Sequence, residues 1–156
     1  MAKVIFTVFA GRKRFLTVLW VYVRRLLSEN TIDEVHLWDY CDDAMGREYI
    51  RTMAPPSHHR IRLMKPPAGN ETLGRWTGYY AYYAEHLTAD NILIKCDDDV
   101  VFIGGLPALL AQVRRDSPRR LLYYPSTVNN DVAAAFQAAD GVGIYIHTYT
   151  HTHIYI

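Results

Sequence analysis

The chain has 156 residues, of which 50% are hydrophobic and 21% are charged, with a formal net charge of +1. This length favours one domain with a substantial core, and the nearly balanced charge argues against a nucleic-acid-binding surface. No apolar run approaches the ~20 residues of a membrane span and the N-terminus lacks a secretion-signal pattern, so we expect a cytoplasmic protein without a membrane span.

Strand and helix patterns alternate along the chain. Stretches rich in β-favouring residues predict strands at residues 3–10, 34–40, 60–64, 91–96 and 121–125. Apolar residues at helical spacing predict helices at residues 13–28, 43–53, 73–87 and 106–115. The third helix is crowded with aromatic side chains that we expect to pack against a sheet: Trp76, Tyr79, Tyr80, Tyr82 and Tyr83. The alternation predicts an α/β fold, a mostly parallel Rossmann-like sheet with helices on both faces.

The most unusual stretch is the strand at 91–96 with the three carboxylates that follow it, Asp97, Asp98 and Asp99. Adjacent carboxylates at the end of a buried strand repel one another and resist desolvation, so they need a compensating cation. On an extended backbone, Asp97 and Asp99 would share one side and Asp98 would point to the other. This arrangement predicts Mn²⁺ or Mg²⁺ at Asp97 and Asp99, completed by water and substrate phosphates.

Other interpretations of the aspartates are a calcium loop, a helix cap and a solvated acidic turn. An EF-hand loop beginning at Asp97 would place Phe102 at the required glycine and Ala108 at the closing glutamate, so that pattern fails. The next helix begins near Leu106, too far along the chain for capping. A solvated acidic turn stays open, although the apolar runs on both flanks argue against it.

Polar residues follow three predicted strands at the edge where parallel sheets bind ligands. Gly11 and Arg12 follow the first strand, Asp39 ends the second, and Asp97 follows the fourth. We expect them to line one cleft. The phosphate-binding motifs GxGxxG and GxxxxGK do not occur in the sequence, so metal and arginine are expected to hold any phosphate group.

The cysteines and the last segment suggest little chemistry. Cys41 and Cys96 form no CxxC pattern, and we expect both to be reduced and structural. Residues 141–156 form a low-complexity tail, set apart from a domain at 1–140. We hypothesise that residues 144–156 are translated repeat DNA, because codons of alternating purines and pyrimidines can encode all of them. The alternative is metal capture by the tail histidines, His147, His151 and His153.

The run from Ile94 to Ile103, with the patterns at residues 3–14 and 74–83, resembles the DxD region of the GT-A glycosyltransferases. Over residues 3–140, the chain most resembles the small N-terminal glycosyltransferase domains of large chlorella-virus proteins. The resemblance implies a GT-A fold, a nucleotide-sugar donor such as a UDP-sugar, and a glycan or other hydroxyl acceptor. It also implies a Mn²⁺ or Mg²⁺ ion that bridges the diphosphate.

The same resemblance implies roles for individual residues. The base and ribose would be held by residues at the ends of the first two strands: Thr7, Ala10, Arg12 and Asp39. Arg75 would reach the diphosphate, unless it is a solvated arginine at a helix end. Asp97 would lie near the ribose or a metal-bound water, Asp98 would belong to the same nucleotide-sugar site, and Asp99 would ligate the metal. Asp39 has the alternative role of an ordinary turn residue.

The sequence departs from the family after Asp99. The later half of these enzymes supplies the acceptor pocket and the catalytic base, whereas here residues 100–140 alone are family-like before the tail. We therefore expect the C-terminal part of the fold to be missing, and we assign no catalytic base. Metal-dependent glycosyl transfer is the predicted function. The alternatives are a truncated nucleotide-sugar-binding remnant and a nucleotidyltransferase, which usually has a more glycine-rich N-terminal loop than Gly11 provides.

Overall fold

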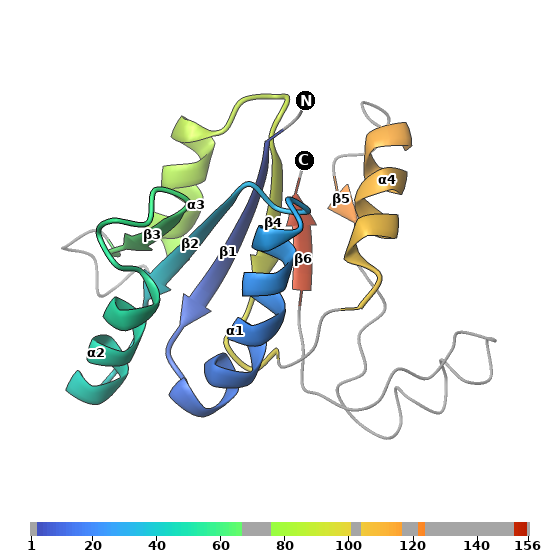
Figure 1. Ribbon diagram of the computed structural model, residues 1–156. Helices are drawn as coiled ribbons and strands as arrows, with labels where there is room; N and C mark the ends of the chain where they lie inside the picture. The colour runs from blue at the N-terminus through green and yellow to red at the C-terminus, as the bar shows by residue number, and fades with distance from the viewer. Residues whose placement is uncertain (1–2, 67–75, 101–103, 117–121, 124–151, 156) are drawn as a thin grey trace, which may run out of the picture.

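The computed structural model describes residues 3–66, 76–100, 104–116, 122–123 and 152–155. The strands in these residues form a six-stranded sheet in the order β3-β2-β1-β4-β6-β5 (Figure 1). The strands are β1 (Val4–Ala10), β2 (Glu34–Asp39), β3 (Ile61–Met64), β4 (Ile92–Cys96), β5 (Leu122–Tyr123) and β6 (Thr152–Tyr155). The helices are α1 (Lys13–Ser28), α2 (Ala44–Met53), α3 (Trp76–His86) and α4 (Leu106–Asp116).

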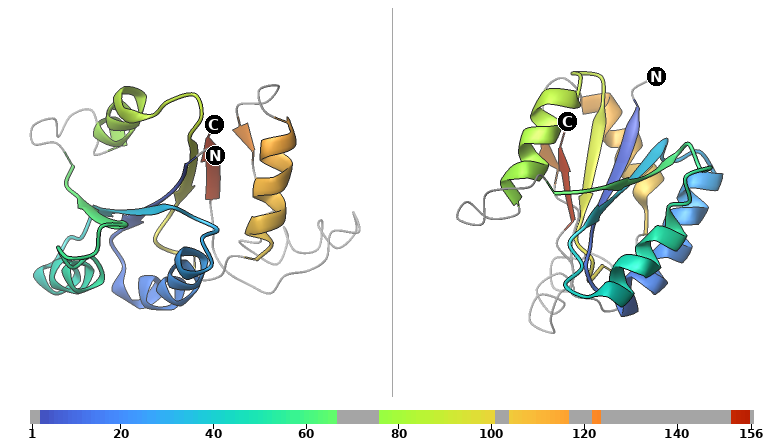
Figure 2. Two further views of the ribbon diagram at one scale, coloured as in Figure 1. Left: turned by 45° about the horizontal axis from the view of Figure 1, so that its top comes forward. Right: turned by 90° about the vertical axis from the view of Figure 1, so that its left-hand side faces the viewer.

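Strands β1 to β4 are parallel, with β1 between β2 and β4 and with β3 at the edge of the sheet. Helices cover both faces of this sheet (Figure 2). The predicted α/β class and the mostly parallel Rossmann-like sheet are therefore confirmed. The elements begin and end close to the predicted residues.

Helix α1 shows how the sequence specifies these elements. Its buried side chains recur at helical spacing: Leu16, Leu19, Val23, Leu26 and Leu27. The helix ends at Ser28, and Asn30 then adopts a left-handed φ of 55°. Thr31 N donates to Leu26 O over 2.9 Å and Asn30 N to Leu27 O over 3.2 Å, which is the pattern of a Schellman cap. This cap turns the chain back into β2.

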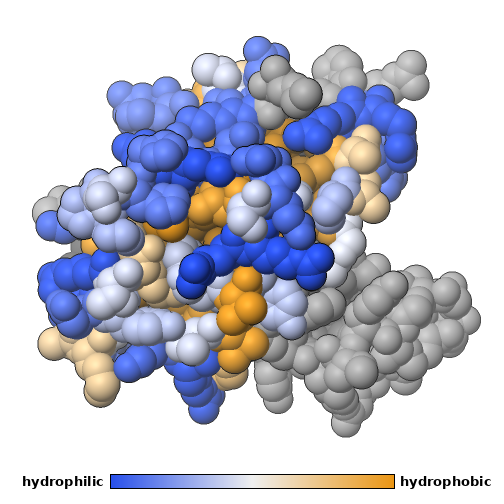
Figure 3. All heavy atoms as spheres, in the orientation of Figure 1, coloured by the Kyte–Doolittle hydropathy of each residue, from blue (hydrophilic) through white to orange (hydrophobic). Residues whose placement is uncertain are grey.

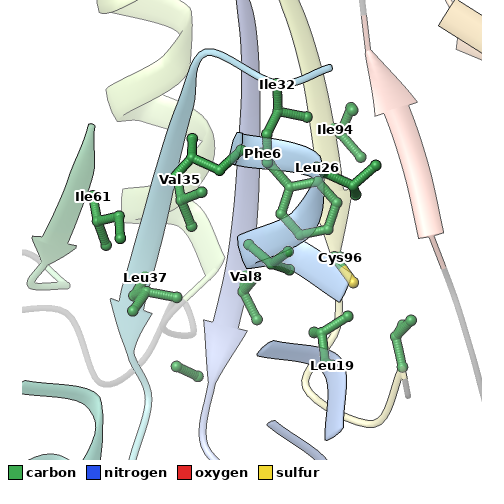
Figure 4. Packing of buried hydrophobic residues seen from close by; sticks show 14 of the residues in the cluster. Phe6, Val8, Leu19, Leu26, Ile32, Val35, Leu37, Ile61, Ile94 and Cys96 are labelled. Carbon is green, nitrogen blue, oxygen red and sulfur yellow. The ribbon is translucent and has the colours of Figure 1, made fainter. Parts of the chain in front are cut away.

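The sheet buries side chains on both of its faces. On one face, Phe6 and Val8 of β1 pack in a cluster with Leu19 and Leu26 of α1 (Figure 4). Residues of α2 and α4 belong to the same cluster. On the other face, Ile5, Phe9, Trp38 and Leu93 pack against α3. Complete burial of a large apolar side chain stabilises a fold by ~1.5–3 kcal/mol, so these clusters dominate the stability.

The hydroxyl groups of two tyrosines of α3 contact polar side chains of the sheet. Tyr79 OH lies 2.8 Å from Thr7 Oγ1, and Tyr83 OH lies 2.6 Å from His36 Nδ1. Tyr79 and Tyr83 are 0% and 4% exposed, whereas Tyr80 is 46% exposed. The expectation that aromatics of this helix pack against a sheet is confirmed for Tyr79 and Tyr83.

Strand β6 comes from the segment that the sequence pattern set apart as a tail. It pairs antiparallel with β4, where Leu93 lies opposite Tyr155, and with β5, where Leu122 lies opposite the same residue. The pairing was not predicted, because low complexity gave no indication of a partner, although Ile, Tyr and Thr favour strands. The repeat-DNA origin of residues 144–156 and the domain boundary at residue 140 stay predictions.

The surface over α1 and α2 is mostly hydrophilic, with hydrophobic side chains between hydrophilic ones (Figure 3). Val18, Val21 and Met45 are among the exposed apolar residues. Scattered apolar side chains are normal on a protein surface. Among the described residues, we find no helix that is both long enough and apolar enough to cross a bilayer.

Candidate functional site

The carboxyl ends of β1, β2 and β4 lie at one edge of the sheet, at the lower side of Figure 1. The strand register places Ala10 beside Asp39 and Val8 beside Cys96. The loops that follow these strands therefore start close together. The structure confirms that the three polar segments predicted from the sequence converge at this edge.

Gly11 lies in the loop after β1, in close contact with Asp98 and Tyr40. A Cβ atom at this position would lie 2.8 Å from Asp98 Oδ2 and 3.3 Å from Tyr40 O. The amide nitrogen of Gly11 donates to the same Asp98 oxygen over 3.1 Å. A side chain here would push Asp98 away, so this close approach requires glycine.

The aspartates lie in a turn that begins where β4 ends. The strand stops at Cys96, and Val100 N donates to Asp97 O over 3.3 Å. Strand alternation therefore stops before the first carboxylate. The alternation argument that placed Asp97 and Asp99 on one side, opposite Asp98, therefore does not apply here: Asp98 and Asp99 share one cationic partner, and Asp97 has another.

Arg12, the N-cap residue of α1, is the shared partner. Its Nε lies 2.9 Å and its Nη2 lies 2.7 Å from Asp98 Oδ1. The same Nη2 lies 3.1 Å from Asp99 Oδ2. The hydrogen bond to Asp98 is the main cause of the raised pKa of Arg12, and the negative charges of both aspartates add to it. Arg12 therefore joins the loop after β1 to the turn after β4.

Lys95 is the second cation, and it was not among the predicted site residues. Its Nζ lies 2.8 Å from Asp97 Oδ1 and 4.8 Å from the ring centroid of Phe9. The register places Lys95 beside Thr7 on β1. The available signal was a lone charged residue in the apolar strand β4, two residues before a carboxylate.

These contacts distinguish a solvated acidic turn from carboxylates whose charge is compensated by cations. Asp98 is 8% exposed, and each of the three carboxylates is paired with Arg12 or Lys95. A solvated acidic turn is therefore the wrong description. The compensating charge that the sequence argument requires is present in the chain itself.

Asp39 makes the contacts of a turn residue. Its Oδ1 accepts from Cys41 N over 3.2 Å and lies 3.9 Å from Arg47 Nε. Cys41 Sγ donates to Ala10 O over 3.1 Å. Burial, followed by the charge of Asp39, raises the pKa of the Cys41 thiol to about 11. Cys41 and Cys96 are both buried and free, as the sequence predicts.

Thr7 and Ala10, the other residues predicted to contact the base and ribose, are buried in β1. Thr7 is 1% exposed in the middle of β1, where its hydroxyl meets Tyr79. Ala10 is 0% exposed, and its carbonyl accepts from Cys41 Sγ and from Tyr40 N. Arg75 lies outside the described residues. The roles of these residues toward a nucleotide-sugar stay predictions.

The carboxylates leave partial room for a divalent cation. Lys95 holds Asp97 Oδ1 and Arg12 holds Asp99 Oδ2. Within the described residues, the second oxygen of each of these side chains has no protein donor, and no cluster of three or more His, Cys, Asp or Glu residues forms a metal cage. Mg²⁺ commonly binds through one or two carboxylates plus water and substrate phosphates. The donor set fits a site of that incomplete kind.

A separate cavity of about 520 Å³ lies near the C-terminal ends of α1 and α2 and the start of β3. Trp20, Arg24, Met53 and His58 are among its lining residues. None of the predicted site residues lines it, so the aspartate turn and this cavity are separate features.

Comparisons with known proteins add a likeness of fold. No family model matches the sequence, and no curated protein matches it. Among solved structures, 4-diphosphocytidyl-2C-methyl-D-erythritol synthase from Anaerococcus prevotii is similar, with a TM-score of 0.48 and 12% sequence identity. The match covers 82% of this chain and 57% of the synthase chain. At this level of similarity, neither a family nor an activity follows for the present protein.

Proposed function

We propose that this chain binds a nucleotide-sugar, in the first instance a UDP-sugar, together with Mn²⁺ or Mg²⁺, and that it serves metal-dependent glycosyl transfer. The cluster of Arg12, Asp97, Asp98 and Asp99 at the carboxyl edge carries this proposal. It brings carboxylate oxygens for a divalent cation next to a guanidinium suited to phosphate oxygens. The sugar would pass to a hydroxyl group of a glycan or another acceptor.

The residues would divide the work according to their surroundings. Asp99 and Asp97, whose side chains are each 25% exposed, would hold the cation through their open oxygens. Asp98 is fixed by Gly11 and Arg12 and would position the turn. Asp39 lies at the same edge and would face the ribose. When bound, the cation offsets the charge that develops on the leaving diphosphate.

Calorimetry of the full chain tests the proposal directly. UDP and several UDP-sugars are titrated with and without Mn²⁺, and we expect binding that depends on the metal. Asp99→Asn should remove this dependence, because it removes a charged ligand oxygen. Asp90→Asn is the matched control, since it removes one negative charge at an exposed position before β4. Metal-independent binding, or equal losses in both variants, would contradict the proposal.

Product analysis separates glycosyl transfer from nucleotidyl transfer. Consumption of a UDP-sugar with release of UDP is the result that glycosyl transfer predicts. Formation of pyrophosphate from UTP and a sugar phosphate would assign the site to nucleotidyl transfer instead. Metal-dependent binding with neither product would identify a nucleotide-sugar-binding module without catalysis.

A further inference from the structure

We infer that Arg12 is an exchangeable counter-ion, which neutralises Asp99 in the empty site and must release that carboxylate when a divalent cation binds. This inference rests on the proposed function for the identity of the cation. It adds a rule for how the cation and the nucleotide depend on each other. The two cations that hold the aspartates, Arg12 and Lys95, differ in ways that support this role for Arg12.

The two cations differ in how freely they can move. The Lys95 side chain is 7% exposed and lies over the ring of Phe9, so burial holds it at Asp97. The Arg12 side chain, by contrast, is 54% exposed. An exposed side chain can change partners without desolvating a charge, whereas a buried lysine cannot. Arg12 is therefore the exchangeable partner.

The contacts of Arg12 also differ in strength. Nε and Nη2 lie 2.9 Å and 2.7 Å from Asp98 Oδ1, and Asp98 Oδ2 is held by Gly11 N. The contact with Asp99 is longer, at 3.1 Å, and the Asp99 side chain is more exposed than that of Asp98, at 25% against 11%. Arg12 can therefore release Asp99 while Nε stays on Asp98.

The exchange links the cation to the diphosphate. A divalent cation that arrives alone must compete with a guanidinium already bound to Asp99. A cation that arrives with a diphosphate offers that guanidinium phosphate oxygens in exchange, and guanidinium–phosphate hydrogen bonds are among the stronger charged contacts. Arg12 should thus weaken the binding of the cation alone and strengthen the binding of cation and nucleotide together, which is positive coupling between two ligands.

The test measures Mn²⁺ binding without nucleotide, and then UDP binding at saturating Mn²⁺, for the full chain and its variants. Arg12→Gln should bind Mn²⁺ alone about tenfold more tightly than the wild type, because a nearby positive charge and a competitor are lost. The same variant should bind UDP with Mn²⁺ about tenfold more weakly, because a charged hydrogen bond is lost. Opposite signs from one substitution are the signature of the exchange.

Two further variants make the result specific. Arg14→Gln removes an equal charge from the same helix start, where Arg14 lies 4.3 Å over the ring of Phe15 and forms no ion pair with the three aspartates, and it should behave as the wild type. Adding Asp99→Asn to Arg12→Gln should cancel the gain in Mn²⁺ affinity. Circular dichroism checks that each variant is folded. If Arg12→Gln unfolds, Arg12→Lys replaces it. Because Arg12→Lys keeps the positive charge, it should retain the weak Mn²⁺ binding of the wild type.

The inference and the proposed function can fail separately. If the wild type binds UDP with Mn²⁺ but Arg12→Gln gains no Mn²⁺ affinity, the counter-ion role is overturned and the function stands. If Arg12→Gln gains Mn²⁺ affinity through Asp99 but neither the wild type nor any variant binds UDP, the counter-ion role stands and the proposed function is overturned. If Arg12→Gln binds no Mn²⁺ at all, the counter-ion role is overturned.

Discussion

The hydroxyl of Tyr83 lies 2.6 Å from Nδ1 of His36, and the two rings stack beneath α3 with their centroids 5.8 Å apart. Trp38 Nε1 also donates to this hydroxyl, over 3.3 Å. The Nε2 of His36 lies 3.3 Å from Glu34 Oε2. A polar network thus runs through the second hydrophobic cluster and fixes α3 on the sheet.

The first prediction concerns the acid sensitivity of this network. Burial lowers the pKa of His36 to about 4, although Glu34 opposes the shift. The unfolded chain takes up a proton near pH 6.5, so stability is lost as the pH falls below that value and the loss levels off near pH 4. We expect the free energy of unfolding to be ~2 kcal/mol lower at pH 5 than at pH 7.5 from this group.

Urea unfolding at the two pH values measures this effect. His36→Gln should flatten the dependence between pH 5 and pH 7.5, because glutamine does not titrate. His59→Gln serves as the control, since it removes a histidine at an exposed position outside this network, and the comparison of the two variants isolates the contribution of His36. A wild type whose stability does not fall between pH 7.5 and pH 5 would disprove the assignment to His36.

The second prediction concerns the close approach at Gly11. Gly11→Ala places a methyl group 2.8 Å from Asp98 Oδ2, so the turn after β4 must shift. We expect a loss of ~1–3 kcal/mol in the free energy of unfolding, as in other overpacked sites. In a background of Asp98→Ala the same change should cost less, because the clashing oxygen is gone. Equal costs in both backgrounds would show that Asp98 is not the obstacle.

The parallel sheet and its helices were predictable because their signals are local. Each residue of β1 is buried, and the buried residues of α1 return at helical spacing, so composition and period were sufficient. The ends of the strands could be predicted for the same reason. This explains why Gly11, Asp39 and Asp97 were correctly expected at one edge of the sheet.

The partners of the aspartates could not be predicted, because they depend on the tertiary structure. Arg12 and Asp98 are 86 residues apart in the chain, and no pattern in the sequence pairs them. The turn after Cys96 breaks the alternation on which the predicted Asp97–Asp99 pair depended. The pairing of β6 with β4 was also out of reach, since a repetitive segment does not specify its neighbour.

The third prediction separates structural from ligand-binding aspartates. Asp98→Ala removes the acceptor of Gly11 N and of Arg12 at a buried site, and we expect it to lower the free energy of unfolding by ~1.5–3 kcal/mol. Asp99→Ala removes one contact of an exposed pair while relieving repulsion, so its effect should stay within ~0.5 kcal/mol. Chemical denaturation compares the two, and a larger cost for Asp99→Ala would reverse the assignment.

The last prediction concerns the pair of Lys95 and Asp97. Their 2.8 Å contact is buried on the lysine side, and removing one partner of such a pair leaves a charge without compensation. Because Asp97 is 25% exposed, water can reach its carboxylate, and we expect Lys95→Met to cost ~1–3 kcal/mol, less than a fully buried pair would. Lys95→Met with Asp97→Asn removes both charges and should cost less than Lys95→Met alone. Urea unfolding of the two single variants and the double variant gives the coupling energy directly. Additive costs would mean that Lys95 stabilises the strand through its contact with Phe9 instead of through Asp97.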